Sequence, residues 1–187
     1  MKMMRYILLS GLMFGMCFCL WGGVAVAGPP SDFPAPPDTD NRLFYLQRST
    51  NPNTVVYDAN MTNKGQLDSD KPVKVYWLRY NNDGKKRGLN FAERNFAYGL
   101  SFDSIEKGQI YSINLMAYSG RDIKVLMNAN GLPEAQVEIN GKMSVLKRIY
   151  LDVSGSGFFT SVNSVELLGV DLKSGEEVIE RFDPDDE

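Results

Sequence analysis

Histidine is absent from this 187-residue chain, and its only two cysteines, Cys17 and Cys19, lie in an apolar segment near the beginning. The rest of the chain therefore cannot build a Ser-His-Asp triad, a thiolate nucleophile, or the usual zinc, copper and haem sites. It cannot form a disulfide either. The chemistries that remain are carboxylate catalysis, a Ser-Lys pair, acid–base catalysis by tyrosine, and calcium bound by oxygen ligands. We predict no metal, no cofactor and no catalytic residue.

The beginning of the chain has the pattern of a signal peptide. Lys2 and Arg5 precede a nearly uncharged apolar run, residues 7–26, which closes on the small-x-small sequence Ala25-Val26-Ala27. We predict that residues 1–27 are removed and that the protein is exported, to the periplasm or outside the cell, with no membrane insertion after cleavage. An uncleaved anchor is the alternative, because residues 7–26 are about long enough to cross a bilayer as a helix.

The charge of the chain argues against nucleic acid as a partner. The formal net charge is −3, and loss of Lys2 and Arg5 with the signal peptide would make it about −5. Binding to nucleic acid or anionic lipid demands a basic face, and the balance here has the opposite sign.

The remainder divides into three parts. Residues 28–41 are rich in proline and acid, which predicts a stiff spacer. Residues 42–182 form the predicted β-rich domain. Residues 183–187 form an acidic tail, which we expect to be a solvated terminus.

Apolar residues of the central part alternate with period two and are interrupted by turn residues, as in an all-β domain. Tight turns are expected at Asn140-Gly141, Ser119-Gly120 and 173–175. The apolar face changes phase between Leu167 and Leu168, which predicts a β-bulge or a strand covered on both sides. The expected strands are Leu43–Ser49, Thr54–Asp58, Val73–Tyr80, Gln109–Tyr118, Asp122–Asn128, Ala135–Ile139, Lys142–Val153, Val165–Leu172 and Glu177–Phe182.

One short helix is predicted at Phe91–Tyr98. Asn90 and Glu93 have capping-box spacing, and Gly99 could stop the helix in a left-handed conformation. A sheet of nine strands must curl to bury its apolar face. We therefore predict a single antiparallel all-β domain with one short helix, either a lipocalin-like meander barrel or a two-layer sandwich.

Two glycine-containing motifs are interpreted as turns. Asn81-Asn82-Asp83-Gly84 is similar to the middle of an EF-hand loop, but Arg79 and Asn90 stand where its first and last acidic ligands should be. Gly155-Ser156-Gly157 lacks the third glycine of a nucleotide loop and opens no helix, so we expect a bend between strands.

Acidic residues leave open a hydrolase that works with two carboxylates on a glycan. Such an enzyme needs only two acids at the correct separation, and any chain with this many acids offers candidate pairs. The candidates are Asp58, Asp83, Asp103, Glu134, Glu138, Asp152 and Glu166.

The strand at Val73–Tyr80 carries large rings on both faces. Val73, Val75 and Trp77 point to one side, and Tyr76, Leu78 and Tyr80 to the other. Aromatic rings with an arginine nearby suit a pocket that stacks on a sugar or an apolar ligand, although packing beneath the helix would also explain them. The candidate ligand-binding residues are Arg48, Tyr57, Asn60, Trp77, Tyr80, Arg94 and Tyr98.

Four segments carry a resemblance to a known family: 43–49, 53–60, 72–77 and 97–99. Through them the chain resembles a family of secreted bacterial domains, the domain of unknown function four-eight-three-three. The resemblance covers most of the chain after the signal peptide and implies a bacterial envelope or secreted setting. It implies no reaction, cofactor or catalytic residue.

The sequence thus favours a non-catalytic ligand-binding or accessory module of the bacterial cell envelope. Its partner would be a small molecule, a glycan or an envelope protein. A carboxylate-dependent glycan hydrolase and a structural component that joins an envelope complex through an open sheet edge are the alternatives.

Overall fold

The computed structural model describes residues 33–155 and 161–184. The predicted signal peptide, most of the bend expected at 155–157 and the end of the acidic tail lie outside the described residues. Within the described part of the chain, no helix is long and apolar enough to cross a membrane.

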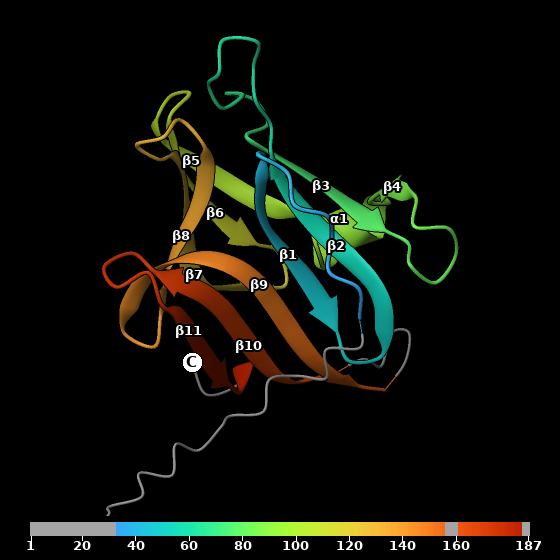
Figure 1. Ribbon diagram of the computed structural model, residues 1–187. Helices are drawn as coiled ribbons and strands as arrows, with labels where there is room; N and C mark the ends of the chain where they lie inside the picture. The colour runs from blue at the N-terminus through green and yellow to red at the C-terminus, as the bar shows by residue number, and fades with distance from the viewer. Residues whose placement is uncertain (1–32, 156–160, 185–187) are drawn as a thin grey trace, which may run out of the picture.

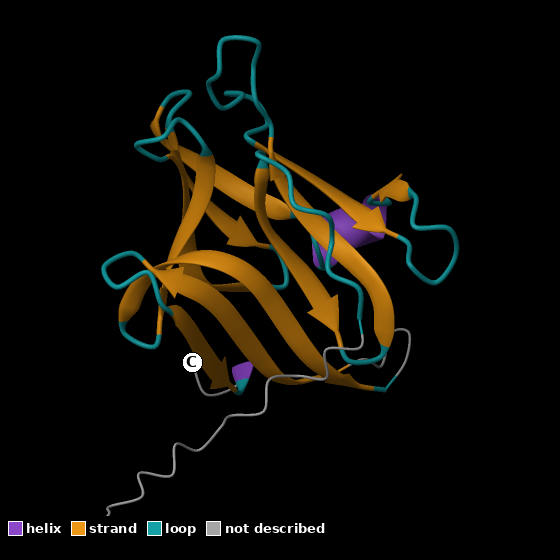
Figure 2. Ribbon diagram, in the orientation of Figure 1, coloured by secondary structure: helices purple, strands orange, loops and turns teal. Residues whose placement is uncertain are grey.

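The described residues form one curled β-sheet with one short α-helix, α1, beside it (Figures 1 and 2). This confirms the predicted all-β class. The elements in chain order are β1 (Arg42–Arg48), β2 (Asn51–Ala59), β3 (Val73–Leu78), β4 (Lys86–Gly88), α1 (Phe91–Phe96), β5 (Leu100–Glu106), β6 (Ile110–Leu115), β7 (Tyr118–Met127), β8 (Pro133–Ile139), β9 (Lys142–Ser154), β10 (Ser161–Asp171) and β11 (Glu177–Phe182).

The long strand β9 organises the sheet. One of its edges is shared by two strands: β8 pairs with its first part and β1 with residues 148–151. Strand β10 pairs with the opposite edge along most of its length, and β11 continues from β10. Two arms, β1–β2–β3–β4 and β8–β7–β6–β5, therefore spread from one side of β9, and the whole sheet curls into a half-barrel (Figure 1).

The β1–β9 pairing is parallel, which corrects the prediction of an entirely antiparallel sheet. Antiparallel neighbours can be joined by a short turn that is visible in the sequence. Strands β1 and β9 are far apart in the chain, so no turn signal indicates that they pair. The order of the strands is consequently not a continuous meander.

The pairing of β9 with β10 is irregular where the sequence changes phase. Between Leu168 and Gly169 the register against β9 shifts, which leaves Lys147 as an extra residue and confirms the predicted irregularity. A Cβ atom on Gly169 would lie 2.6 Å from Ile139 Cδ1 and 2.8 Å from the Val145 carbonyl oxygen. Glycine at this position lets β10 come close to β8 although the two strands pair with opposite edges of β9.

Most local predictions are confirmed, but some need correction. Asn140 (φ 48°) and Gly141 (φ 73°) make the expected left-handed hairpin turn. The turn after β6 is at residues 116–117 rather than Ser119-Gly120, which lie in β7. Strands β4 and β5 were not predicted, because β4 has three residues and the second half of β5 is exposed without alternation.

Helix α1 begins as its sequence predicts but ends differently. The Asn90 side chain accepts from the Glu93 N–H at 2.9 Å, and the Glu93 carboxylate accepts from the Asn90 N–H at 2.8 Å. Gly99 does not have the predicted left-handed conformation, since it is absent from the glycines with positive φ. A Cβ atom at this position would clash with the Arg94 carbonyl oxygen, so glycine is needed there for close approach of the backbone.

Part of the predicted spacer packs on the sheet. Pro36 is buried, the Gln47 side chain donates to the Pro34 carbonyl at 3.3 Å, and the Tyr80 hydroxyl donates to the Ala35 carbonyl at 3.2 Å. This segment, the blue trace before β1 in Figure 1, runs along the outer face of the sheet. The opposite, inner face carries the apolar core.

Candidate functional site: an apolar cavity inside the half-barrel

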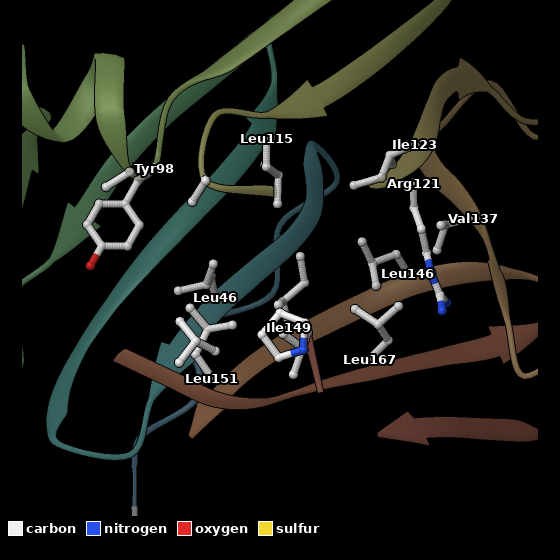
Figure 3. A pocket seen from close by; sticks show the side chains of 15 residues that line it. Leu46, Tyr98, Leu115, Arg121, Ile123, Val137, Leu146, Ile149, Leu151 and Leu167 are labelled. Carbon is white, nitrogen blue, oxygen red and sulfur yellow. The ribbon is translucent and has the colours of Figure 1, made fainter. Parts of the chain in front are cut away.

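A cavity of about 100 Å³ lies on the inner face of the half-barrel. Figure 3 shows side chains from β1, β6, β7, β8, β9 and β10 directed into the same space. The lining residues are Leu46, Ala97, Tyr98, Leu115, Ala117, Arg121, Ile123, Val137, Leu146, Ile149, Leu151, Val162, Val165, Leu167 and Pro184.

The lining is almost entirely aliphatic. Tyr98 and Arg121 are its only polar side chains among the described residues, and it contains no carboxylate, amide or small hydroxyl group. Alternation of β9 and β10 explains this composition: Ile149 and Leu151 on β9, like Val165 and Leu167 on β10, point inward. An apolar ligand fits such a wall, whereas a sugar would find few partners for its hydroxyl groups.

Arg121 closes one side of the half-barrel. Its stem lines the cavity, and its guanidinium group donates to both carboxylate oxygens of Glu180 on β11, at 2.7 and 2.9 Å. The same group donates to the Glu138 carbonyl oxygen at 3.1 Å and lies 4.7 Å from the Phe182 ring centroid. The hydrogen bond from Arg121 outweighs burial and lowers the pKa of Glu180. The pair links β7 to β11 by side chains.

At the other end, three predicted site residues meet. The Arg48 guanidinium carbon lies 5.3 Å from the Trp77 ring centroid and 5.5 Å from that of Tyr98. The two rings contact each other edge to face at 4.9 Å. The fully buried Tyr57 supports them by donating its hydroxyl hydrogen to the Tyr98 carbonyl oxygen at 2.8 Å. Desolvation raises the pKa of both Tyr57 and Tyr98, so both hydroxyls stay protonated.

Two buried donors in this cluster lack acceptors. Arg48 Nε and Trp77 Nε1 have no hydrogen-bond partner among the described residues. Burial by itself would raise the pKa of the neighbouring Glu93. Hydrogen bonds from the Arg87 side chain and the Asn90 backbone outweigh burial, so the pKa of Glu93 is lowered. The Trp77 indole N–H also lowers the pKa of Glu93, by less than these two groups, although its position relative to Glu93 does not meet the geometry of a hydrogen bond.

The remaining predicted site residues lie elsewhere. Asn60 donates to the Lys71 carbonyl oxygen at 2.8 Å, in the connection between β2 and β3. Tyr80 holds the segment before β1 on the outer face. Arg94 is exposed, donates to the Leu89 carbonyl oxygen at 3.4 Å, and borders a different pocket beside Gly99. Only Tyr98 of the seven predicted residues lines the cavity, and sequence reasoning missed the other lining residues.

No candidate carboxylate lines the cavity. Asp58 accepts from Arg42 and from the Tyr76 hydroxyl, each at 2.6 Å, and burial together with the Asp58 bond raises the pKa of Tyr76 to about 12. Glu166 is buried against Arg148 at 2.9 Å. Within residues 33–155 and 161–184, no three acidic side chains gather in a way that could hold a metal ion. The remaining candidate acids are Asp83, Asp103, Glu134, Glu138 and Asp152, and none of them faces this cavity.

Comparison with known proteins identifies the family. A family model described as "Domain of unknown function (DUF4833)" matches residues 44–181. The chain belongs to this family. The matched region of the family begins within β1 and ends within β11, so it spans the whole half-barrel with its cavity. Neither the curated proteins nor the solved structures give a match.

Proposed function

We propose that this chain is a non-catalytic binding module that holds a small apolar ligand inside its half-barrel and works in the bacterial envelope. The observation that carries the proposal is the aliphatic cavity of about 100 Å³. Empty apolar space of that size lowers stability by about 2 kcal/mol, at about 24 cal/mol per Å³. A ligand that fills the space recovers the lost contacts, and the small set of polar groups at its ends would orient it.

An apolar ligand suits the walls better than the sugar that the aromatic residues of the Val73–Tyr80 strand suggested. Trp77 packs against Tyr98 instead of presenting an open face for stacking, and it is 5% exposed. Stacking on a sugar needs an accessible ring face and nearby hydrogen-bonding groups. Neither is offered here.

1-Butanol, with four carbons, tests the proposal as an uncharged probe. A ligand that binds only the folded protein raises the midpoint of thermal unfolding, because binding adds RT ln(1 + [L]/Kd) to the free energy of unfolding. We expect 1-butanol to raise the midpoint of the natural chain and to have little effect on Leu167→Phe, whose larger ring occupies the cavity. The matched control is Leu172→Phe, a position 45% exposed just beyond β10, which should respond as the natural chain does.

A second variant covers the possibility that Leu167→Phe overpacks the core. Ala117 lines the cavity from the exposed turn between β6 and β7, so Ala117→Leu should fill part of the space with less strain. Equal shifts of the unfolding midpoint by 1-butanol in the natural chain and both cavity variants would refute the proposed site.

The envelope location rests on the residue pattern at 1–27. Cell fractionation with mass spectrometry tests it. We expect the protein outside the cytoplasm with Gly28 as its first residue, and a cytoplasmic protein that keeps Met1 would contradict the location without affecting the binding site.

A further inference from the structure

Arg48 stands at one end of the cavity. Two residues earlier on β1, Leu46 lines the cavity, and Arg48 pairs across the parallel ladder with Leu151, another lining residue. Its guanidinium group lies against the ring of Tyr98, which also borders the cavity. In Figure 3, Leu46, Leu151 and Tyr98 mark this end of the space.

The charge of Arg48 is not balanced by an acid. Within the described part of the chain, no carboxylate lies within 4 Å of it, although its side chain is half-buried between two rings. Four of the other half-buried arginines each have a carboxylate oxygen at 2.6–2.9 Å: the pairs are Arg42–Asp58, Arg87–Glu93, Arg121–Glu180 and Arg148–Glu166. Arg79 is also half-buried without such a pair among the described residues, but it lies in the connection between β3 and β4.

The unfilled donor beside this charge points to a missing acceptor. Arg48 Nε is buried without a hydrogen-bond partner among the described residues. Arg42 Nη1 and Arg148 Nε are also without one, but each of those guanidinium groups binds a carboxylate through another nitrogen. A buried polar group without a partner costs free energy, and in native structures such a group calls for an explanation, such as an absent ligand. A planar guanidinium donates two parallel hydrogen bonds to a carboxylate, and this arrangement is among the strongest in proteins.

Resting on the binding function proposed above, we infer that the ligand is an anionic amphiphile, a short-chain monocarboxylate whose head binds Arg48 and whose tail fills the aliphatic cavity. The volume sets the length of the tail. An apolar cavity of about 150 Å³ holds the six carbons of benzene, so about 100 Å³ has room for about four carbons.

Calorimetric titration with two matched ligand series tests the inference. The first is the straight-chain carboxylates from butanoate to octanoate, and the second is the alcohols of equal length. For the natural chain we expect carboxylate affinity to rise about fourfold with each methylene until the tail fills the cavity, and then to level off. Each carboxylate should bind about 10- to 150-fold more tightly than its alcohol, the range for a hydrogen bond to a charged group.

Arg48→Met should remove the preference for carboxylates and leave alcohol binding unchanged. Lys124→Met is the matched control, because it removes one positive charge from an exposed position on β7, and it should leave both series unchanged. Arg48→Lys keeps the charge without the planar fork, so its preference should be intermediate. This second variant serves the test if the methionine variant does not fold, as judged by urea unfolding.

The two proposals fail in distinguishable ways. Alcohols that bind as tightly as carboxylates, or a carboxylate preference that survives in both Arg48 variants, would overturn the assignment of Arg48 and leave the binding function standing. Absence of binding by carboxylates and alcohols alike, 1-butanol included, would refute the binding function and this inference together.

Discussion

The close approach of β8 and β10 across the curled strand β9 predicts that Gly169→Ala destabilises the protein. The added Cβ would lie 2.6 Å from Ile139 Cδ1, 2.8 Å from the Val145 carbonyl oxygen and 3.3 Å from Ser144 Cβ. The end of the Ile139 side chain could rotate away, but Ile139 is fully buried and the Val145 oxygen belongs to the backbone of β9. Relief therefore requires movement of a strand.

Overpacking of this kind costs about 1–3 kcal/mol. A glycine-to-alanine change also stiffens the unfolded chain, which by itself would stabilise by about 0.4–1 kcal/mol. We expect the clash to outweigh that gain, so that the free energy of unfolding falls by about 1–2 kcal/mol. Urea unfolding followed by circular dichroism measures the change. The slope of the free energy of unfolding against urea concentration should stay the same.

Gly88→Ala is the matched control on the same sheet. Gly88 ends β4, has no positive φ, and leaves a new Cβ with nothing within 4 Å. It should therefore be as stable as the natural chain or slightly more stable. If Gly169→Ala is also as stable as the natural chain, the contact between β8 and β10 cannot be what shapes the half-barrel.

Two further stability predictions concern the ends of the cavity. Tyr57→Phe leaves the Tyr98 carbonyl oxygen without its 2.8 Å partner and should lower the free energy of unfolding by about 1–2 kcal/mol; an unchanged urea midpoint would show that this bond contributes nothing. Glu180 has a lowered pKa in the folded protein because Arg121 donates to it, so the unfolded chain binds more protons as the pH falls through the acid range. Its contribution to stability is fully present above the unfolded pKa of about 4.3 and is lost as the pH falls through the lower folded pKa. Glu180→Gln should make the free energy of unfolding between about pH 5 and pH 2 less dependent on pH. If this dependence is the same as in the natural chain, the pairing of Glu180 with Arg121 is contradicted.

Local patterns in the sequence predict much of the fold. Asn140-Gly141 marks a hairpin because both residues accept positive φ, and Asn90 with Glu93 marks the helix start by reciprocal capping. The phase change at Leu167-Leu168 marks the irregularity that curls β9 and β10. Each of these signals lies within a few residues of chain, which is why it can be seen without the structure.

Long-range features could not be predicted in this way. The parallel β1–β9 pair joins residues about a hundred positions apart, and nothing near either strand encodes it. The cavity is lined by ordinary aliphatic residues from six strands, and these residues have the same pattern whether they fill a core or surround a space. Packing alone decides between the two.

The candidate site was predicted in part. Arg48, Tyr57, Trp77 and Tyr98 do cluster. Tyr80 could have been separated from them by sequence alone, because it is three residues from Trp77 and an odd spacing puts the two on opposite faces of a strand. The importance of Arg48 depends on its lack of an acidic partner, which only the arrangement of the other arginines and acids reveals.

Methyl NMR during titration with pentanoate tests the central claim most directly. The account predicts saturable shifts of the methyl signals of Leu46, Leu146, Ile149 and Leu167, which line the cavity, with little change at the exposed Leu132 and Leu172. Shifts confined to exposed methyl groups, or a linear drift without saturation, would contradict the claim that the half-barrel holds an apolar ligand.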